Sequence, residues 1–171
     1  MKEAIHRDLL SCQELVYAPC GFDYSPPRRE AESAEYGAYF FELNGFAVRF
    51  RVAKTTPTKL GQFVTLWKRM GKGPIQPYDL ADNVDFFIVS TRLGDFFGQF
   101  VFPSAVLCEQ NIVSKQGKGG KRAIRVYPPW DKPMSLQAKK TQCWQLKHFL
   151  EIPYKETIDC VRTQVLYTLR T

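Results

Sequence analysis

The sequence predicts a single mixed α/β domain in which helices cover a β-sheet. The chain has 171 residues, which is the length of one domain. Hydrophobic residues make up 44% of it and aromatic residues 14%, enough for one core and too many for a mostly disordered chain. Runs with the composition of strands are followed by segments with helical spacing, a mixture typical of this class.

The N-terminal segment is predicted to be an amphipathic helix over residues 2–17. Its apolar residues lie three or four positions apart, as on one helix face: Ile5, Leu9, Cys12 and Val16. Prolines and a glycine over residues 19–27 end this helix and begin a loop.

A β-hairpin follows, with strands over residues 36–43 and 46–53 joined by Asn44-Gly45, a dipeptide typical of a two-residue hairpin turn. Further along, the patterns predict these elements in order: strands over 62–68, 85–91 and 97–102, a short helix from Pro103 to Glu109, a flexible basic loop over 114–121, a strand over 123–127, a helix capped by Ser135 that runs to about Leu150, and a terminal helix after Pro153.

The hairpin turn also predicts which residues face each other. Partners have numbers that add to 89, so Val52 lies opposite Gly37 and Lys54 opposite Glu35 at the end of an apolar row. Lys54 is then either a half-buried structural partner of Glu35 or a functional group at the rim of a site.

The cysteines indicate a reducing environment. There are five, at positions 12, 20, 108, 143 and 160, an odd number without a C-x-x-C pair. We therefore expect reduced, buried thiols, no zinc site and a cytoplasmic location. The apolar stretch at 96–108 is too short to cross a membrane, and the charged residues before Cys12 do not resemble an export signal.

The net charge of +7 is concentrated in two segments. Residues 49–72 carry seven basic and no acidic side chains, and residues 111–150 carry nine basic and one acidic. If the two segments converge in space, they form a surface for phosphate groups. The alternative is that both are ordinary solvated faces, neutralised by the acidic segments between and before them.

A long run from Phe50 to Arg69 is followed by short motifs rich in tryptophan and proline, among them Gly73-Pro74-Ile75, Phe97–Pro103, Arg125–Asp131 and Thr141–Gln145. Together these motifs cover about residues 30–152 and resemble the MepB-like family. That family consists of bacterial proteins without a settled biochemical activity. The resemblance implies a fold similar to the PD-(D/E)XK restriction-endonuclease-like domains, a mixed β-sheet flanked by helices. The helices predicted from spacing at 2–17 and within 153–171 lie outside the resemblance, as extensions of this domain.

The same resemblance implies a remnant of a nuclease catalytic site. In such nucleases an Asp, and a Glu two residues before a Lys, hold a divalent metal. Lys54 matches the Lys, but Val52 stands at the position of the lost Glu, and Glu35 offers a single carboxylate. We therefore expect no metal, no cofactor and no catalysis. The alternative is a metal-dependent nuclease with a migrated site built from Glu32, Glu35 and Lys54.

The partner predicted on this basis is nucleic acid, DNA or RNA, bound without sequence preference through its phosphates. A protein-binding adaptor with a basic surface is the other alternative. The ring motif at 127–130 could stack bases or pack as a local core. The candidate contacts are Lys54, Lys59, Gln62, Lys68, Arg69, Lys121, Arg122, Arg125, Tyr127 and Trp130.

Overall fold

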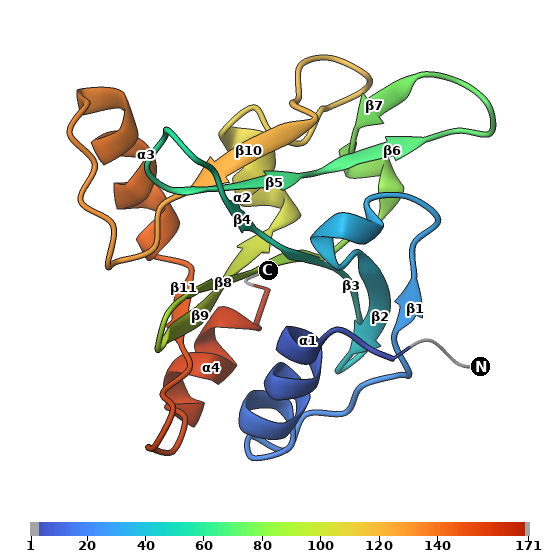
Figure 1. The fold of residues 1–171 in the computed structure, drawn as a ribbon. Helices are drawn as coiled ribbons and strands as arrows, with labels where there is room; N and C mark the ends of the chain where they lie inside the picture. Colours follow the sequence, from blue (N-terminus) through green and yellow to red (C-terminus); the bar gives the residue numbers. More distant parts are fainter. Residues whose placement is uncertain (1–3, 170–171) are drawn as a thin grey trace.

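The computed structural model describes residues 4–169 and shows a mixed α/β fold built around one six-stranded sheet. Positions 2–3 of the expected first helix and positions 170–171 of the C-terminal extension lie outside the described residues. The strand order is β1-β2-β3-β8-β9-β11, with β3 and β8 parallel and the other neighbours antiparallel. Helices α1 and α4 lie on one side of this sheet, and a smaller sheet with α2 and α3 lies on the other (Figure 1).

The hairpin forms in the expected register. Strands β2 (Tyr39–Leu43) and β3 (Phe46–Val52) pair Leu43 with Phe46, because Asn44 and Gly45 both adopt positive φ angles in the turn. The first strand begins later than predicted. Residues 34–36 instead form a short 3₁₀ helix, η2 (Ala34–Tyr36).

The central strands are buried on both faces. Strands β8 (Phe86–Leu93) and β9 (Phe96–Pro103) confirm the two predicted apolar runs, and β11 (Phe149–Glu151) and β1 (Arg28–Arg29) form the edges. Along β8, Phe86 packs into the core shared with α1 and α4, whereas Phe87 packs into the core beneath the smaller sheet. Because successive side chains point to opposite faces of the sheet, one strand contributes residues to two hydrophobic cores.

The smaller sheet arises from the segment between β3 and β8 and from one later strand. Its order is β10-β5-β4, with β4 (Lys54–Thr55), β5 (Gln62–Thr65) and β10 (Ala123–Val126). The predicted strand over 62–68 is therefore divided, because the chain leaves β5 at Leu66 and pairs as β6 (Trp67–Arg69) with β7 (Ile75–Pro77). The 3₁₀ turn η3 (Leu80–Asp82) then leads into β8.

The helices follow the predicted order with shorter bounds. Helix α1 (Arg7–Cys12) continues as a π-helical turn, η1 (Gln13–Tyr17), and α2 (Ser104–Glu109) follows Pro103 as expected. The side chain of Ser135 accepts from the backbone N–H of Ala138 and caps α3 (Leu136–Leu146). That helix ends before Leu150, which belongs to β11, and α4 (Cys160–Leu166) begins seven residues after Pro153.

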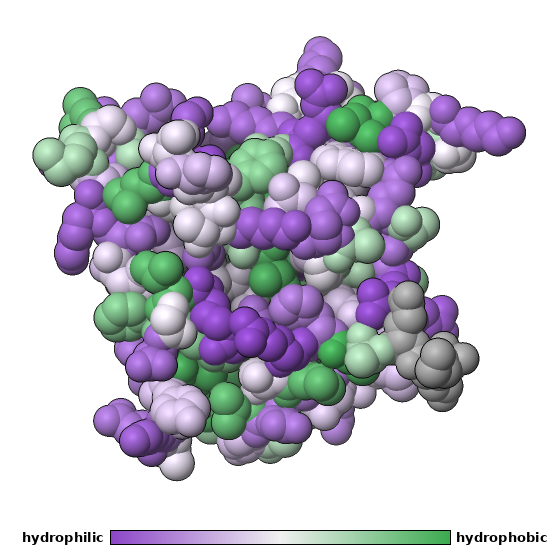
Figure 2. Space-filling view, in the orientation of Figure 1, coloured by the Kyte–Doolittle hydropathy of each residue, from purple (hydrophilic) through white to green (hydrophobic). Residues whose placement is uncertain are grey.

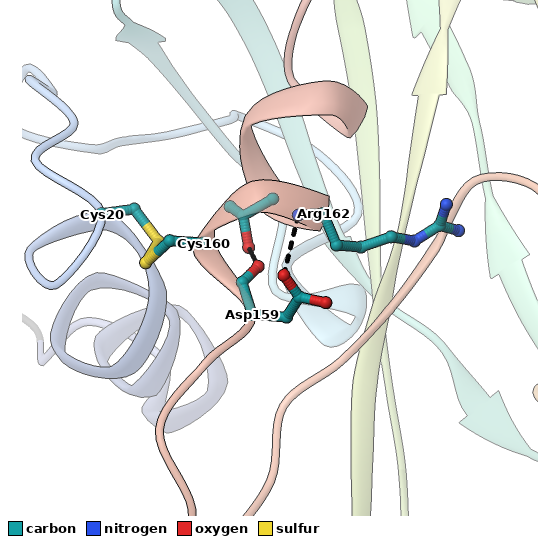
Figure 3. Close-up of a disulfide and its surroundings, with 5 residues drawn as sticks. Cys20, Asp159, Cys160 and Arg162 are labelled. Carbon is teal, nitrogen blue, oxygen red and sulfur yellow. Dashed lines mark hydrogen bonds between the residues drawn. A yellow bond between two sulfur atoms is a disulfide. The ribbon is translucent and has the colours of Figure 1, made fainter.

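Two cysteines differ from the expectation of reduced thiols. Cys20, after η1, and Cys160, at the start of α4, form a disulfide with a Cα–Cα distance of 5.4 Å (Figure 3). The pairing arises because both helical segments pack on the same core. The two cysteines are 140 residues apart in sequence, so the sequence does not show that they are neighbours. Cys12 is free and buried as predicted, and burial raises the pKa of its thiol to about 12. Disulfides are rare in the cytoplasm, so the thiol argument for that location does not hold for this pair.

Among the described residues, none of the helices has both the length and the apolar composition needed to cross a membrane.

Candidate nucleic-acid interface

A cavity of about 420 Å³ lies between the smaller sheet and α3. We call it the β10–α3 cavity. Its strand side is formed by β5, β10 and their flanking loops, and its helix side by the first two turns and the last turn of α3. The lining residues are Lys59, Phe63, Gln110, Ile112, Lys121, Ala123, Ile124, Arg125, Tyr127, Ser135, Gln137, Ala138, Thr141, Trp144 and Gln145.

Hydrogen bonds from two glutamines fix α3 against the strand side of this cavity. The buried side chain of Gln145 accepts from the N–H of Tyr127 (2.9 Å) and donates to the carbonyl of Arg125 (3.0 Å). Gln142 donates to the carbonyls of Pro128 (3.0 Å) and Asp131 (2.9 Å). The backbone after β10 is therefore held by the helix, and the cavity is preformed.

Three cations line the cavity, and no carboxylate does. Lys59 and Lys121 are exposed at their positions in the loops before β5 and β10. The guanidinium of Arg125 donates to Thr56 Oγ1 (3.0 Å) and to the carbonyls of Leu60 (3.2 Å) and Gly61 (3.3 Å). These partners are neutral oxygens, so they do not compensate the positive charge of Arg125, which at the same time holds the loop that carries Lys59.

Two further features make this region positive. Ser135 at the N-terminus of α3 is part of the lining, and that end of an 11-residue helix carries partial positive charge. A neighbouring depression shares Gln110, Gln137, Thr141 and Trp144 with the cavity and adds Leu136 and Lys140. In Figure 2 the upper part of the molecule, over the smaller sheet and the β6–β7 hairpin, is mostly hydrophilic, with separate hydrophobic patches.

The basic loop at 114–121 is anchored rather than flexible. Oδ2 of Asp79 accepts from Ser114 Oγ (2.7 Å) and from the N–H of Gly117 (3.0 Å). Together with the N–H of Ala81, these hydrogen bonds lower the pKa of Asp79 to about 2. At the end of the loop, the N–H of Lys121 donates to the carbonyl of Ile112 (2.9 Å). The position of Lys121 at the cavity is therefore set by the fold.

Lys68 and Arg69, predicted as phosphate contacts, lie elsewhere. Lys68 Nζ is 2.6 Å from Asp82 Oδ1, and Arg69 Nε is 2.7 Å from Glu32 Oε1. Both pairs line a different depression, beside Glu30 and Trp67. The internal neutralisation considered for the basic segments thus applies to these two residues.

Gln62 and Trp130, the other proposed base contacts besides Tyr127, are buried and partly buried, respectively. Gln62 is 4% exposed and donates to the carbonyl of Arg92 (2.8 Å). The Trp130 ring stacks on Phe96 with centroids 5.3 Å apart and meets Phe149 edge-on. Neither side chain lines the cavity. Arg122 is exposed but is not among the lining residues.

The remnant site does not assemble as the register predicted. Ser33 and Gly37 adopt left-handed conformations that turn the chain into η2, which carries Glu35 off the strand. Lys54 Nζ instead lies 4.8 Å from the centroid of the Tyr36 ring, and no ion pair joins it to Glu35 within the described chain. The expected Glu35–Lys54 pair is wrong for this reason.

Val52 and Gly37 do lie close together. A Cβ placed on Gly37 would come within 2.9 Å of the Val52 side chain, which packs at the margin of the core beneath α1. Glu32, the other carboxylate of the migrated-site hypothesis, is the partner of Arg69. In the part of the chain that the structure describes, no group of three or more His, Cys, Asp or Glu side chains is arranged to hold a metal ion.

A buried charged cluster escaped prediction. The Arg51 side chain is 1% exposed, forms an ion pair with Glu30 and donates to the carbonyl of Thr65 (3.2 Å). Glu30 also accepts from Arg49 (3.0 Å) and from the hydroxyl of Tyr78 (2.9 Å). Burial, reinforced by the charge of Glu30, raises the pKa of Tyr78. The cluster ties the central sheet to β5; its one sequence signal was the pair of arginines two positions apart on a strand.

A family model and a solved structure are similar to this chain. The sequence model of the MepB-like family matches residues 30–151. A solved structure titled "Crystal Structure of MepB" is 33% identical, with 77% of this chain and 89% of that chain covered and a TM-score of 0.73. A bacterial homing endonuclease, I-Ssp6803I, is 14% identical over 81% of this chain and 88% of its own, with a TM-score of 0.45. None of the curated proteins searched matches the chain.

The fold and the cavity thus define a mixed α/β domain with a basic, preformed depression beside its smaller sheet. The chain belongs to the MepB-like family, as its motifs predicted.

Proposed function

We propose that the protein binds nucleic acid through its phosphates at the β10–α3 cavity, without sequence preference and without cleaving it. One observation carries the proposal: Lys59, Lys121 and Arg125 come from separate segments and line one cavity that contains no carboxylate.

Phosphate binding follows from the state of these cations. The two lysines are exposed and form no ion pair within the described residues, so each can neutralise a phosphate and release its counterions. Arg125 and the N-terminus of α3 add fixed positive charge beside them. Contacts of this kind position a nucleic acid but carry no sequence information, which supports binding without sequence preference.

The absence of catalysis is proposed from the residues at the remnant site. Val52 cannot ligate a metal, and Glu35 on η2 and Lys54 on β4 form no ion pair with each other in the described chain. In the competing migrated-site hypothesis, Glu32 would have to leave Arg69 before it could serve a metal. These features favour a protein with an endonuclease-like fold that binds without cutting.

The proposal is tested by binding of labelled DNA and RNA to paired variants. In K59A/K121A, two cavity lysines are removed; in the control K72A/K155A, two exposed lysines outside the cavity are removed, so the net charge of both variants is the same. We expect fluorescence anisotropy to report binding about tenfold or more weaker for the first variant and little changed for the control.

Two results would contradict the proposal. Equal losses in the two variants would mean that net charge, not the cavity, attracts the ligand. Binding of polyglutamate that matches the binding of nucleic acid would favour the adaptor with an acidic protein partner.

A further inference from the structure

The β10–α3 cavity has features that phosphate binding alone does not need. Half-buried rings of Phe63, Tyr127 and Trp144 line it together with the cations. The Phe63 ring packs against Tyr36 (6.1 Å between centroids) and Trp144 against Phe102 (5.4 Å). These rings are held in place by protein contacts from one side while another part of each lines the cavity.

A close approach of the backbone holds the Tyr127 ring. Gly61 has φ +81°, and a Cβ there would come within 2.8 Å of two Tyr127 ring carbons. Only glycine leaves room for the ring at this position. The wall formed by Tyr127 is therefore fixed by the loop that Arg125 holds.

The cations are distributed along the cavity rather than gathered at one point. Strands β5 and β10 are antiparallel, with Ala123 opposite Thr65 and Val126 opposite Gln62. Lys59 precedes β5 and Lys121 precedes β10, so the two lysines flank opposite ends of the strand pair. Three residue steps along these strands span about 10 Å. An anionic chain could thus contact one lysine on each side of a group placed between them.

We infer that the cavity takes one unpaired nucleotide of a single-stranded nucleic acid, with its base between the aromatic walls and the neighbouring phosphates at Lys59 and Lys121. The volume of about 420 Å³ lies in the range of small-molecule sites. Aromatic side chains bind unpaired bases through their faces whatever the base, which is consistent with the lack of sequence preference.

A paired base does not fit this description. In a duplex each base is stacked and hydrogen-bonded, and extracting it costs unpairing energy. The amides of Gln110 and Gln137 line the same cavity, are exposed, and make no side-chain hydrogen bond within the described residues. They supply polar groups for the edge of an unpaired base. The inference rests on the proposed nucleic-acid binding and adds the class of strand.

The test fills the cavity without changing charge. Ala138 lies on α3 and lines the cavity, whereas Ala105 is exposed on α2 and lines none of the cavities described above. Variants A138F and A105F therefore make the same substitution inside and outside the site. Thermal melting checks whether A138F folds. If it does not, Q137W replaces it in the test, because this substitution fills the rim of the cavity from an exposed position.

Each variant is titrated with single-stranded DNA, single-stranded RNA and duplex DNA of the same sequence, and with nucleoside monophosphates as competitors. We expect wild-type protein and A105F to bind single strands about tenfold more tightly than duplex, and A138F or Q137W to lose that preference. Nucleoside monophosphates should compete with single strands for wild-type protein and A105F, and should not compete for A138F or Q137W, in which the cavity is filled.

The outcomes separate the two proposals. Equal binding of single strands and duplex by wild-type protein, unchanged in A138F and Q137W, would overturn the inference and leave phosphate binding intact. No binding of any of these probes by wild-type protein would overturn the proposed function as well. The DNA and RNA arms show which sugar the site accepts.

Discussion

Breaking the disulfide should lower the free energy of unfolding more than any other single change at the surface. Cys20 and Cys160 are separated by 140 residues, so the bond closes a loop that includes most of the chain. In the chain-entropy treatment, closing a loop of this length lowers the conformational entropy of the unfolded state and so raises its free energy by about 5 kcal/mol. That value is comparable to the whole stability of many domains, about 5 to 15 kcal/mol. The segments joined by the bond also share a core, so the protein should still fold without it.

Urea unfolding followed by circular dichroism measures this effect. Wild-type protein with and without dithiothreitol is compared with C20S, C160S and, as a control, C143S, which removes an exposed free thiol. The midpoint should fall by the same amount in C20S, in C160S and in the reduced wild type, and C143S should match the oxidised wild type. A midpoint that dithiothreitol leaves unchanged would refute the reasoning.

Three other predictions concern the Arg51–Glu30 ion pair, the hydrogen bonds of Asp79 and the absence of cleavage. R51M should lower the free energy of unfolding by about 3 kcal/mol or more in urea melts, because the Glu30 carboxylate, with a side chain only 11% exposed, would lose the buried arginine paired with it; a loss below about 1 kcal/mol would contradict the importance of this ion pair. D79N should speed amide exchange at Gly117, and the contribution of Asp79 to stability should be complete above its ordinary pKa of 3.8 and be lost as the pH falls toward 2, since folding lowers this pKa. Wild-type protein should leave DNA and RNA intact with Mg²⁺ or Mn²⁺; cleavage that E32A and K54A abolish would instead establish the migrated-site nuclease.

Local chemistry made much of the fold predictable. The turn at Asn44-Gly45 set the hairpin register, and Ser135 marked the start of α3, because both act through neighbouring backbone groups. The apolar runs of β8 and β9 were equally visible, since strands buried on both faces are continuously hydrophobic.

Other features depend on tertiary contacts and could not be read from the chain. The left-handed conformation of Ser33 gives no sequence signal, yet it starts the turn that removes Glu35 from the strand. The pairing of Cys20 with Cys160 depends on how two distant helical segments pack.

The positive charge of the candidate site could be predicted from the sequence, but which basic residues line the cavity could not. Segment charge placed Lys59, Lys121 and Arg125 among the candidate contacts, and the fold brings these three residues to one cavity. Lys68 and Arg69 lie in the same basic segment as Lys59, but each pairs with a carboxylate. These partners are 14 and 37 residues away in sequence, so the segment charge does not reveal them. Such partners decide whether a cation is available to a ligand.

The central claim is that the lysines of the β10–α3 cavity contact phosphates, and the dependence of binding on salt tests it most directly. Affinity for single-stranded DNA is measured between about 50 and 200 mM salt for wild-type protein, K59A/K121A and K72A/K155A. If each cavity lysine neutralises one phosphate of the single strand, the slope of log affinity against log salt should be shallower by about 1.4 in K59A/K121A and unchanged in K72A/K155A. Equal slopes in all three proteins would contradict the account.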